Sequence, residues 1–209
     1  GGISILGSSG IVEPMSEKAL TDTIYLEMKM IRSSGYERCY IVPGNYGMDF
    51  LTEQLELDAE LTVKCSNYVG EAIEDARLLG MKGILLIGHV GKWVKLAAGV
   101  MNTHSRQGAD CRMEVLAVHA AMQGADRESV CRIMQCLNTT EALKIIRQLG
   151  ILEPVMASVM DRIDFYLSGR AGGEFEIGAI MFSNEDGILG KTPNAEQLLE
   201  RIQNERKQK

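Results

Sequence analysis

The stretch "GILLIGHVGKWVKLAAGV", residues 83–100, indicates the architecture of this chain. Its first part, Gly83 to Ile87, is a run of aliphatic side chains, which is typical of a strand buried on both faces of a parallel sheet. The glycine-bearing segment "GHVGKW" follows, and an amphipathic helical pattern begins there. A strand, a short loop and a helix in this order open a βαβ unit, so the stretch predicts a parallel sheet.

The same order of elements recurs along the first hundred residues. We expect three further strands, each followed by a helical pattern, at Ile3 to Leu6, Cys39 to Val42 and Leu61 to Cys65. The first helix has the clearest signals, because Ser16 can cap its N-terminus and Gly35 can end it. Its apolar stripe, at helical spacing, consists of Leu20, Ile24, Met28 and Ile31.

The pattern changes after residue 108. Helical stretches follow at 110–123, 126–137, 139–149 and 152–169. Asp110, Asp126 and Asn138 are placed to cap the first three, and Glu141 completes a capping box with Asn138. The segment "EFEIGAIMFS", residues 174–183, then has the alternation and β-branching of a strand, and a charged helix closes the chain.

The predicted fold is α/β: a mostly parallel, Rossmann-like sheet with flanking helices, followed by a helical segment and a late strand that rejoins the sheet. We expect one compact domain in three parts. These are an α/β ligand-binding core at 1–108, a helical segment at 109–170, and a closing strand with the C-terminal helix at 171–209.

The composition limits the class of protein. Of the 209 residues, 45% are hydrophobic and 24% are charged, as in ordinary globular domains. No apolar run approaches about 20 residues and no signal-peptide pattern is present, so we expect no membrane association and a cytoplasmic location. The formal net charge of −6 disfavours a nucleic-acid binder. Five scattered cysteines, and histidines without zinc-site spacing, predict reduced thiols and no metal bound by the protein itself.

Four strand-to-helix loops are expected to meet at one site, because ligands of open parallel sheets bind beyond the carboxyl ends of the strands. The loops are "GSSGIVEP" at 7–14, "PGNYG" at 43–47, "SNYVGE" at 66–71 and "GHVGKW" at 88–93. Glycine allows close approach of the backbone to a ligand, and Ser and Asn supply hydrogen bonds. A tight turn explains any one loop, whereas all four together predict a shared small-molecule site.

The first loop matches neither common phosphate-binding fingerprint. It lacks the GxGxxG spacing and the Gly-Lys-Ser/Thr ending of a P-loop, which disfavours a nucleotide triphosphate site and a Rossmann-type dehydrogenase. Glu13, late in the loop, is placed either to accept hydrogen bonds from ribose hydroxyls or an amine, or to be solvated.

The fourth loop carries a local positive charge. Lys92 and Lys95 lie one turn apart at the start of a predicted helix, where cations oppose the helix dipole unless an anion is bound nearby. From His89 to Arg112 the sequence has four Lys or Arg and one Asp. The pattern indicates an anionic small molecule, and two solvated lysines are the alternative. His89 and His104 are candidates for proton transfer or carboxylate binding, whereas a mid-helix position predicts that His119 is packed.

These segments resemble the CbiD-type cobalt-precorrin-5B C1-methyltransferases of anaerobic cobalamin biosynthesis. The resemblance is carried, in the family's order, by "GGISILGSSGIVEPMS" at 1–16, "VPGNYG" at 42–47, "SNYVGE" at 66–71 and "LLIGHVGKWVKLAAGVMNTHSRQGADCRMEVLA" at 85–117. It implies transfer of a methyl group from S-adenosylmethionine to ring carbon C1 of a carboxylate-rich cobalt tetrapyrrole. Family members generally have an N-terminal domain before "GGISILG", so we expect this chain to be a C-terminal portion.

The resemblance and the loop positions together give the expected roles. His89 and His104 are the expected catalytic residues. The methyl donor, S-adenosylmethionine, is expected near Gly7, Ser8, Ser9, Gly10, Glu13, Asn45, Tyr46 and Asn67. The anionic cobalt tetrapyrrole is expected near Lys92, Lys95, Ser105 and Arg112. An alternative is a non-catalytic nucleotide- or tetrapyrrole-binding module that needs a further domain or partner for activity. The sequence leaves open whether the chain forms a homo-oligomer.

Overall fold

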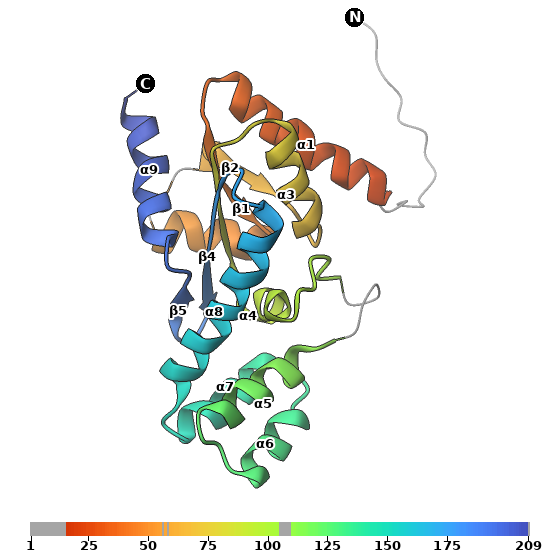
Figure 1. The fold of residues 1–209 in the computed structure, drawn as a ribbon, viewed down its shortest axis with the longest axis vertical. Coiled ribbons are helices and arrows are strands. Elements are labelled where there is room, and N and C mark those ends of the chain that lie inside the picture. Colours follow the sequence, from red (N-terminus) through yellow and green to blue (C-terminus); the bar gives the residue numbers. More distant parts are fainter. Residues whose placement is uncertain (1–15, 56, 58, 105–109, 209) are drawn as a thin grey trace, which may run out of the picture.

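The computed structural model describes residues 16–55, 57, 59–104 and 110–208. Within them the chain is an α/β fold built on one five-stranded sheet (Figure 1). The strands are β1 (Arg38–Val42), β2 (Thr62–Lys64), β3 (Gly83–His89), β4 (Glu176–Ser183) and β5 (Gly187–Lys191). They lie in the order β2-β1-β3-β4-β5. The first four are parallel and β5 is antiparallel to β4, which confirms a mostly parallel sheet.

The order of the described strands differs from that of the classical dinucleotide-binding arrangement. That fold has the order 3-2-1-4-5-6, whereas 2-1-3-4-5 is the flavodoxin-like order. In both, the chain first moves outward from β1 and later crosses back over it. The expectation of an α/β class is therefore confirmed, whereas the Rossmann-like arrangement stays a prediction.

The predicted strands shift at their ends. β2 is shorter than the predicted Leu61 to Cys65, and the predicted strand at Ile3 to Leu6 lies outside the described residues. β3 is longer than predicted, because Gly88 and His89 pair with Met181 and Phe182 of β4. The late strand does rejoin the sheet as β4, parallel to β3.

β5 was not predicted from the sequence. Glycines at 187 and 190 weaken the strand pattern of this segment. Gly190 is required by packing, because a Cβ there would lie 2.6 Å from Cγ of Met160. β5 is thus stabilised by its pairing with β4 and by its contact with the helix that contains Met160, and the local sequence reveals neither.

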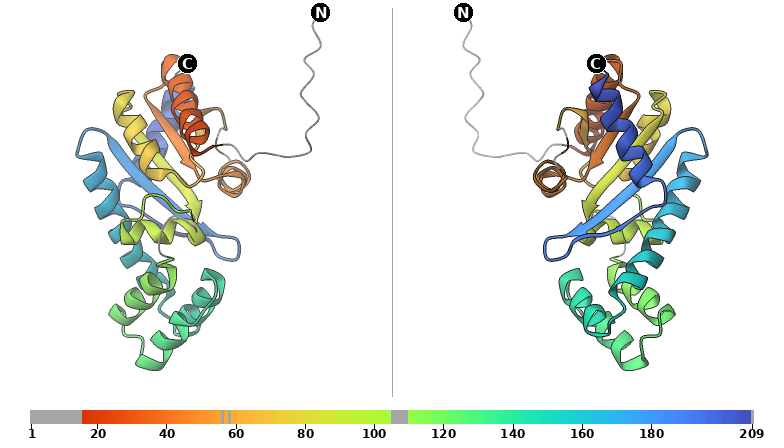
Figure 2. Two further views of the ribbon diagram at one scale, coloured as in Figure 1. Left: turned by 90° about the vertical axis from the view of Figure 1, so that its right-hand side faces the viewer. Right: turned by 90° about the vertical axis from the view of Figure 1, so that its left-hand side faces the viewer.

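The described helices cover both faces of the sheet, with α1, α3 and α8 on one face and α9 on the other (Figure 2). The longer ones are α1 (Glu17–Ser33), α3 (Val69–Leu78), α5 (Arg112–Met122), α6 (Arg127–Met134), α7 (Thr139–Gln148), α8 (Leu152–Ala171) and α9 (Ala195–Lys207). The short ones are α2 (Asn45–Asp49), α4 (Val90–Trp93), a π-helix at Phe50–Gln54 and 3-10 turns at Ala59–Leu61 and Val94–Ala98. None of the helices in the described ranges is both long and apolar enough to span a bilayer.

The four helices predicted between 110 and 169 are confirmed as α5 to α8. α5, α6 and α7 form a group at one end of the molecule, and α8 runs from this group along the sheet (Figures 1 and 2). His119 of α5 is buried, and its Nδ1 lies 2.7 Å from the hydroxyl of Ser158 on α8. The expectation of a packed histidine is confirmed.

Three of the four predicted caps are also confirmed, and the cap at Asp110 is wrong, because the N-cap of α5 is Cys111, without a side-chain hydrogen bond. Ser16 accepts from the backbone N–H of Ala19, Asp126 from that of Ser129, and Asn138 from that of Glu141. The carboxylate of Glu141 accepts from the N–H of Leu137, one residue before the expected partner of a capping box.

Asn138→Ala is expected to lower the free energy of unfolding by about 1 kcal/mol, because the N–H of Glu141 loses its acceptor. Urea denaturation measures the change. Asn138→Ser, which keeps an acceptor at the cap, is the matched control and should cost only a few tenths of that. An alanine variant as stable as the unsubstituted chain would contradict the assigned cap.

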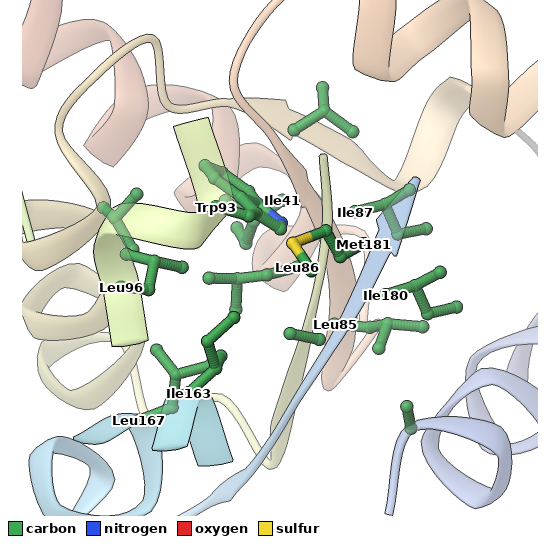
Figure 3. Close-up of a cluster of buried hydrophobic side chains, with 14 of the residues drawn as sticks. Ile41, Leu85, Leu86, Ile87, Trp93, Leu96, Ile163, Leu167, Ile180 and Met181 are labelled. Atoms are coloured by element: carbon green, nitrogen blue, oxygen red, sulfur yellow. The ribbon is translucent and has the colours of Figure 1, made fainter. Parts of the chain in front are cut away.

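The core lies on both faces of the sheet, between β3 and β4 and the helices that cover them. Its buried side chains include Leu86, Ile87, Trp93, Ile163 and Met181 (Figure 3). Trp93 is fully buried and lies directly against Gly88, where a Cβ would come within 2.4 Å of the indole ring. Close packing at the end of β3 therefore requires glycine at position 88.

Candidate functional site

The direction of chain progression across the sheet reverses between β1 and β3, and ligands of open parallel sheets bind outside the carboxyl ends of the strands at such a point. Two glycines at this point of the sheet pack against other residues of the chain and leave no space for a side chain. A Cβ at Gly47 would lie 3.0 Å from Pro43 and Val42, and one at Gly88 would overlap Trp93. These glycines allow α2 and Trp93 to pack on the strand ends, which differs from the ligand approach expected from the sequence.

Two chain segments beside this point are joined by hydrogen bonds. The backbone N–H of Thr103 donates to the carbonyl of Asn67 at 2.9 Å, and the N–H of Gly70 donates to Met101 at 3.1 Å. Tyr68 and Asn102 form an antiparallel bridge. We call this pairing of residues 66–70 with 101–103 the loop ladder. It connects the start of α3 to the segment that follows the 3-10 turn at Val94–Ala98.

Both predicted lysines contact the loop ladder. Lys92 Nζ lies 3.4 Å from the carbonyl oxygen of Ser66, and Lys95 Nζ lies 3.4 Å from that of Thr103. Lys95 is only 4% exposed, and neither ammonium forms an ion pair with a described residue. Burial lowers the pKa of Lys92. Cations removed from water without a counter-ion are costly, so an anion bound beside the ladder would stabilise these two lysines.

Ser66 has an unusual backbone conformation. Its φ of 52° makes it the one non-glycine residue with a positive φ among those described. A left-handed conformation costs an L-residue about 1 kcal/mol or more, and such strain is concentrated at functional sites. At Ser66 the strained residue supplies the carbonyl that accepts from Lys92.

His89 ends β3 and caps α4. Its Nδ1 accepts from the backbone N–H of Gly91 at 3.1 Å, so the ring proton resides on Nε2. Burial lowers the pKa of His89, which favours the neutral ring at pH 7. The ring also contacts Phe182 edge-on, with the centroids 5.6 Å apart. In this arrangement the imidazole is held in one tautomer and offers an N–H donor at Nε2.

The other predicted residues are more dispersed. Asn45 Oδ1 accepts from Lys64 at 3.2 Å, and Tyr46 is 74% exposed. His104 donates its backbone N–H to Asn102 Oδ1. Arg112 Nε donates to Asp110 Oδ1 at 2.7 Å, and this ion pair lowers the pKa of Asp110. The remaining predicted residues, Gly7, Ser8, Ser9, Gly10, Glu13 and Ser105, lie outside the described residues.

Sequence reasoning missed the turn between β4 and β5. Ser183 and Asn184 line two cavities there, of about 300 and 220 Å³. The larger one also contains Tyr46 and Phe50, and Phe50 stacks on Phe182 with centroids 3.8 Å apart. The smaller one contains His89. The polar run "SNEDG" at 183–187 was the available signal, but its place near His89 depends on the pairing of β4 with β3.

A further cavity lies between α1 and α3. We call it the α1–α3 cavity; it has a volume of about 650 Å³ and is lined by Asp22, Tyr25, Glu71, Asp75, Asn102 and Arg170, among others. Burial, together with the carboxylates of Glu71, Asp22 and Glu74, raises the pKa of Asp75 to about 6. Within the described ranges, no three His, Cys, Asp or Glu side chains are grouped so as to hold a metal ion.

Comparison with known proteins decides the family. Residues 102–193 match the family model described as CbiD, C-terminal domain. The cobalt-precorrin-5B C(1)-methyltransferase of Ruminiclostridium cellulolyticum is 44% identical over 207 residues, which cover 97% of this chain and 54% of that protein. This chain belongs to the CbiD family. The curated protein of the same name from Alkaliphilus metalliredigens is 40% identical over 98% of the chain and 54% of its own length, and that from Clostridioides difficile is 37% identical over 96% and 49%.

The CbiD family match and the resemblance seen in the sequence cover different parts of the chain. The sequence motifs lie mostly before residue 117, whereas the family model begins at 102 and extends through β5. The matched region therefore includes half of the loop ladder, the α5 to α8 helices and the turn that sequence reasoning missed. The chain spans about half the length of the curated relatives it matches. No solved structure matches it.

Proposed function

We propose that this chain is the C-terminal part of a CbiD-type enzyme that transfers a methyl group from S-adenosylmethionine to C1 of cobalt-precorrin-5B. The observation that carries the proposal is the 44% identity, over 97% of the chain, to a protein named cobalt-precorrin-5B C(1)-methyltransferase. The arrangement of charge at the loop ladder supports it, because the substrate class carries many carboxylates.

S-adenosylmethionine, when bound, supplies an electrophilic methyl group on a positively charged sulfur. In the transfer, the bond from sulfur to the methyl carbon breaks as the bond to C1 forms, and sulfur keeps the electron pair. A displacement of this kind needs the two reactants in line and at short distance, so the main task of the protein is orientation. We assign that task to the loops at the carboxyl ends of β1 to β4.

The two lysines that contact the loop ladder are the proposed ligands for the carboxylates of the tetrapyrrole. Lys92 and Lys95 have no ion-pair partner among the described residues, and charge-assisted hydrogen bonds to carboxylates are among the strong ones. Arg112 remains a proposed ligand, although it is paired with Asp110 and would have to exchange that partner.

The histidine roles follow from their surroundings. His89 lines the same cavity as Ser183 and Asn184, so we assign its Nε2–H a hydrogen bond to a substrate oxygen. His104 follows the loop ladder directly and is the proposed residue for proton transfer. Asn45, Tyr46 and Asn67 stay in the proposed set, on the loops that flank the strand reversal.

Calorimetric titration with S-adenosylhomocysteine, the product form of the donor, tests the proposal. We expect saturable binding to the intact chain. Absence of heat at about 1 mM ligand, which corresponds to binding weaker than about −4 kcal/mol, would count against a donor site in this chain.

A second candidate function is favoured by one observation, the coverage of only about half of each relative. Under it, the chain is a non-catalytic binding module that presents tetrapyrrole or nucleotide to a further domain. Mixing the chain with cobalt-precorrin-5B and S-adenosylmethionine, with and without the remaining half of a relative, separates the two by mass spectrometry. A methylated product supports the catalytic proposal, and binding without product in both mixtures supports the module.

A further inference from the structure

The α1–α3 cavity is a separate place in which a small molecule would fit. α1 and α3 lie side by side on one face of the sheet (Figure 1), and the cavity between them also reaches Gly70 and Asn102 of the loop ladder. Its volume of about 650 Å³ is in the range of ligand-binding pockets. Tyr25 adds an aromatic ring to the wall, and Gly70 leaves part of that wall as bare backbone.

The charged groups of this cavity have both signs, and among the described residues only Glu74 has an ion-pair partner, Arg77. The carboxylates of Asp22, Glu71 and Asp75 form no ion pair with any described residue. The guanidinium of Arg170 likewise forms none within the described chain, and it reaches within 3.9 Å of the position of a Cβ on Gly70. Unpaired groups of opposite sign in one cavity fit a ligand that itself carries cationic groups and one carboxylate.

The protonation of Asp75 agrees with this description. Burial, Glu71, Asp22 and Glu74 disfavour its charged form, which raises its pKa to about 6. The free energy of unfolding therefore falls as the pH rises from 3.8, the ordinary pKa of this carboxyl, to about 6, and this penalty persists at neutral pH. A cation bound among these carboxylates would remove part of the penalty.

We propose that the α1–α3 cavity binds S-adenosylmethionine, with the carboxylates around its sulfonium and ammonium groups and Arg170 at its carboxylate. The inference rests on the proposed methyltransferase function and locates the donor sub-site within it. Among the residues expected to bind the donor, Asn67 adjoins this cavity through the loop ladder, whereas Asn45 and Tyr46 lie beside β2 and the turn after β4.

The loop ladder links the two sub-sites. The cavity contacts Gly70, Met101 and Asn102, while Lys92 and Lys95 donate to the neighbouring residues Ser66 and Thr103. A cationic donor is thereby attracted to an acidic surface and an anionic acceptor to a basic one, and each surface repels the other ligand. The two reactants then approach each other across a single hydrogen-bonded element, with their binding sites kept distinct by charge.

Calorimetry with two analogues tests the site. Sinefungin carries an ammonium group in place of the sulfonium, whereas S-adenosylhomocysteine has a neutral sulfur there. We expect the intact chain to bind sinefungin about tenfold more tightly, the effect of one charge-assisted contact. Asp75→Asn should remove this preference. Arg170→Gln should weaken both ligands by a similar factor of about ten, because both carry the carboxylate.

Asp161→Asn is the matched control, since it removes the same charge from the exposed surface of α8 and should leave both affinities unchanged. Asp75→Asn should also raise the midpoint of thermal unfolding at pH 7.5, because it removes a disfavoured carboxylate. Weaker binding by a more stable variant cannot result from unfolding. The preference for sinefungin should fall between pH 7.5 and pH 5.5 in the intact chain as Asp75 is protonated.

The outcomes separate the two proposals. If the intact chain binds the analogues but Asp75→Asn and Arg170→Gln bind them equally well, the donor site is elsewhere, and only this inference is overturned. If the intact chain binds neither analogue, the proposed donor role of the chain fails as well. Loss of the sinefungin preference in Asp75→Asn, with Asp161→Asn unchanged, supports both.

Discussion

Gly88→Ala is expected to lower the free energy of unfolding by about 3 kcal/mol. The added Cβ would lie 2.4 Å from Cε2 of Trp93, a distance that real Cβ contacts do not show. Because the indole is fully buried against β3, it cannot turn away without disturbing the core, and overpacking of this kind costs about 1–3 kcal/mol or more. Trp93 is the one tryptophan of the sequence, so its fluorescence during urea denaturation reports the change directly.

Gly169→Ala is the matched control for this substitution. Gly169 lies inside α8, and a Cβ there would meet no atom within 4 Å. Alanine is favoured over glycine within helices by about 0.5–1 kcal/mol, so this variant should be more stable than the unsubstituted chain. If both variants change stability by the same amount and sign, the close contact between Gly88 and Trp93 is wrong.

Lys92→Gln is expected to weaken binding of a carboxylate-rich cobalt corrinoid by about 10- to 100-fold. This range corresponds to the loss of one charge-assisted hydrogen bond of about 1.5–3 kcal/mol. Lys95→Gln should act in the same direction. Neither change should alter the affinity for S-adenosylhomocysteine by a comparable factor. Corrinoid absorbance during an equilibrium titration gives the first affinity, and calorimetry gives the second.

Lys82→Gln controls for the loss of charge. Lys82 precedes β3 at the opposite edge of the sheet and pairs with Glu37, so its substitution should leave corrinoid binding unchanged. Lys95 is buried, and the Trp93 signal must show that its variant is folded. Equal losses of corrinoid and donor affinity in Lys92→Gln would refute the assignment of the two sub-sites.

Local patterns in the sequence were sufficient for most elements. The stripe of α1, the caps at Asp126 and Asn138 and the aliphatic run of β3 depend on neighbouring residues, and each was correctly predicted. The failures depend on pairing with another strand, which the pattern of a single segment does not show. β3 is longer than predicted, and β5 exists, because both pair with β4, about 90 residues after β3 and directly before β5.

The candidate site was also only partly predictable from local sequence patterns. Charge alone was sufficient to single out Lys92 and Lys95, but their burial and their acceptors depend on how residues 66–70 pair with 101–103. The α1–α3 cavity was not anticipated at all. Its charged side chains lie on the surfaces of two helices and on the end of a third, where isolated acidic residues have the ordinary appearance of solvated positions.

α8 has a mechanical consequence for this arrangement. With 20 residues at 1.5 Å each, it is a rod of about 30 Å. Ser158, about a third of the way along α8, is hydrogen-bonded to His119 of the helical group, and Arg170 near the C-terminal end lines the α1–α3 cavity. Because α8 contacts both regions and packs on β4 and β5 between them, we expect a shift of the helical group to be transmitted along α8 to the guanidinium of Arg170. Substitutions remote from the cavity can thus change its shape without touching it.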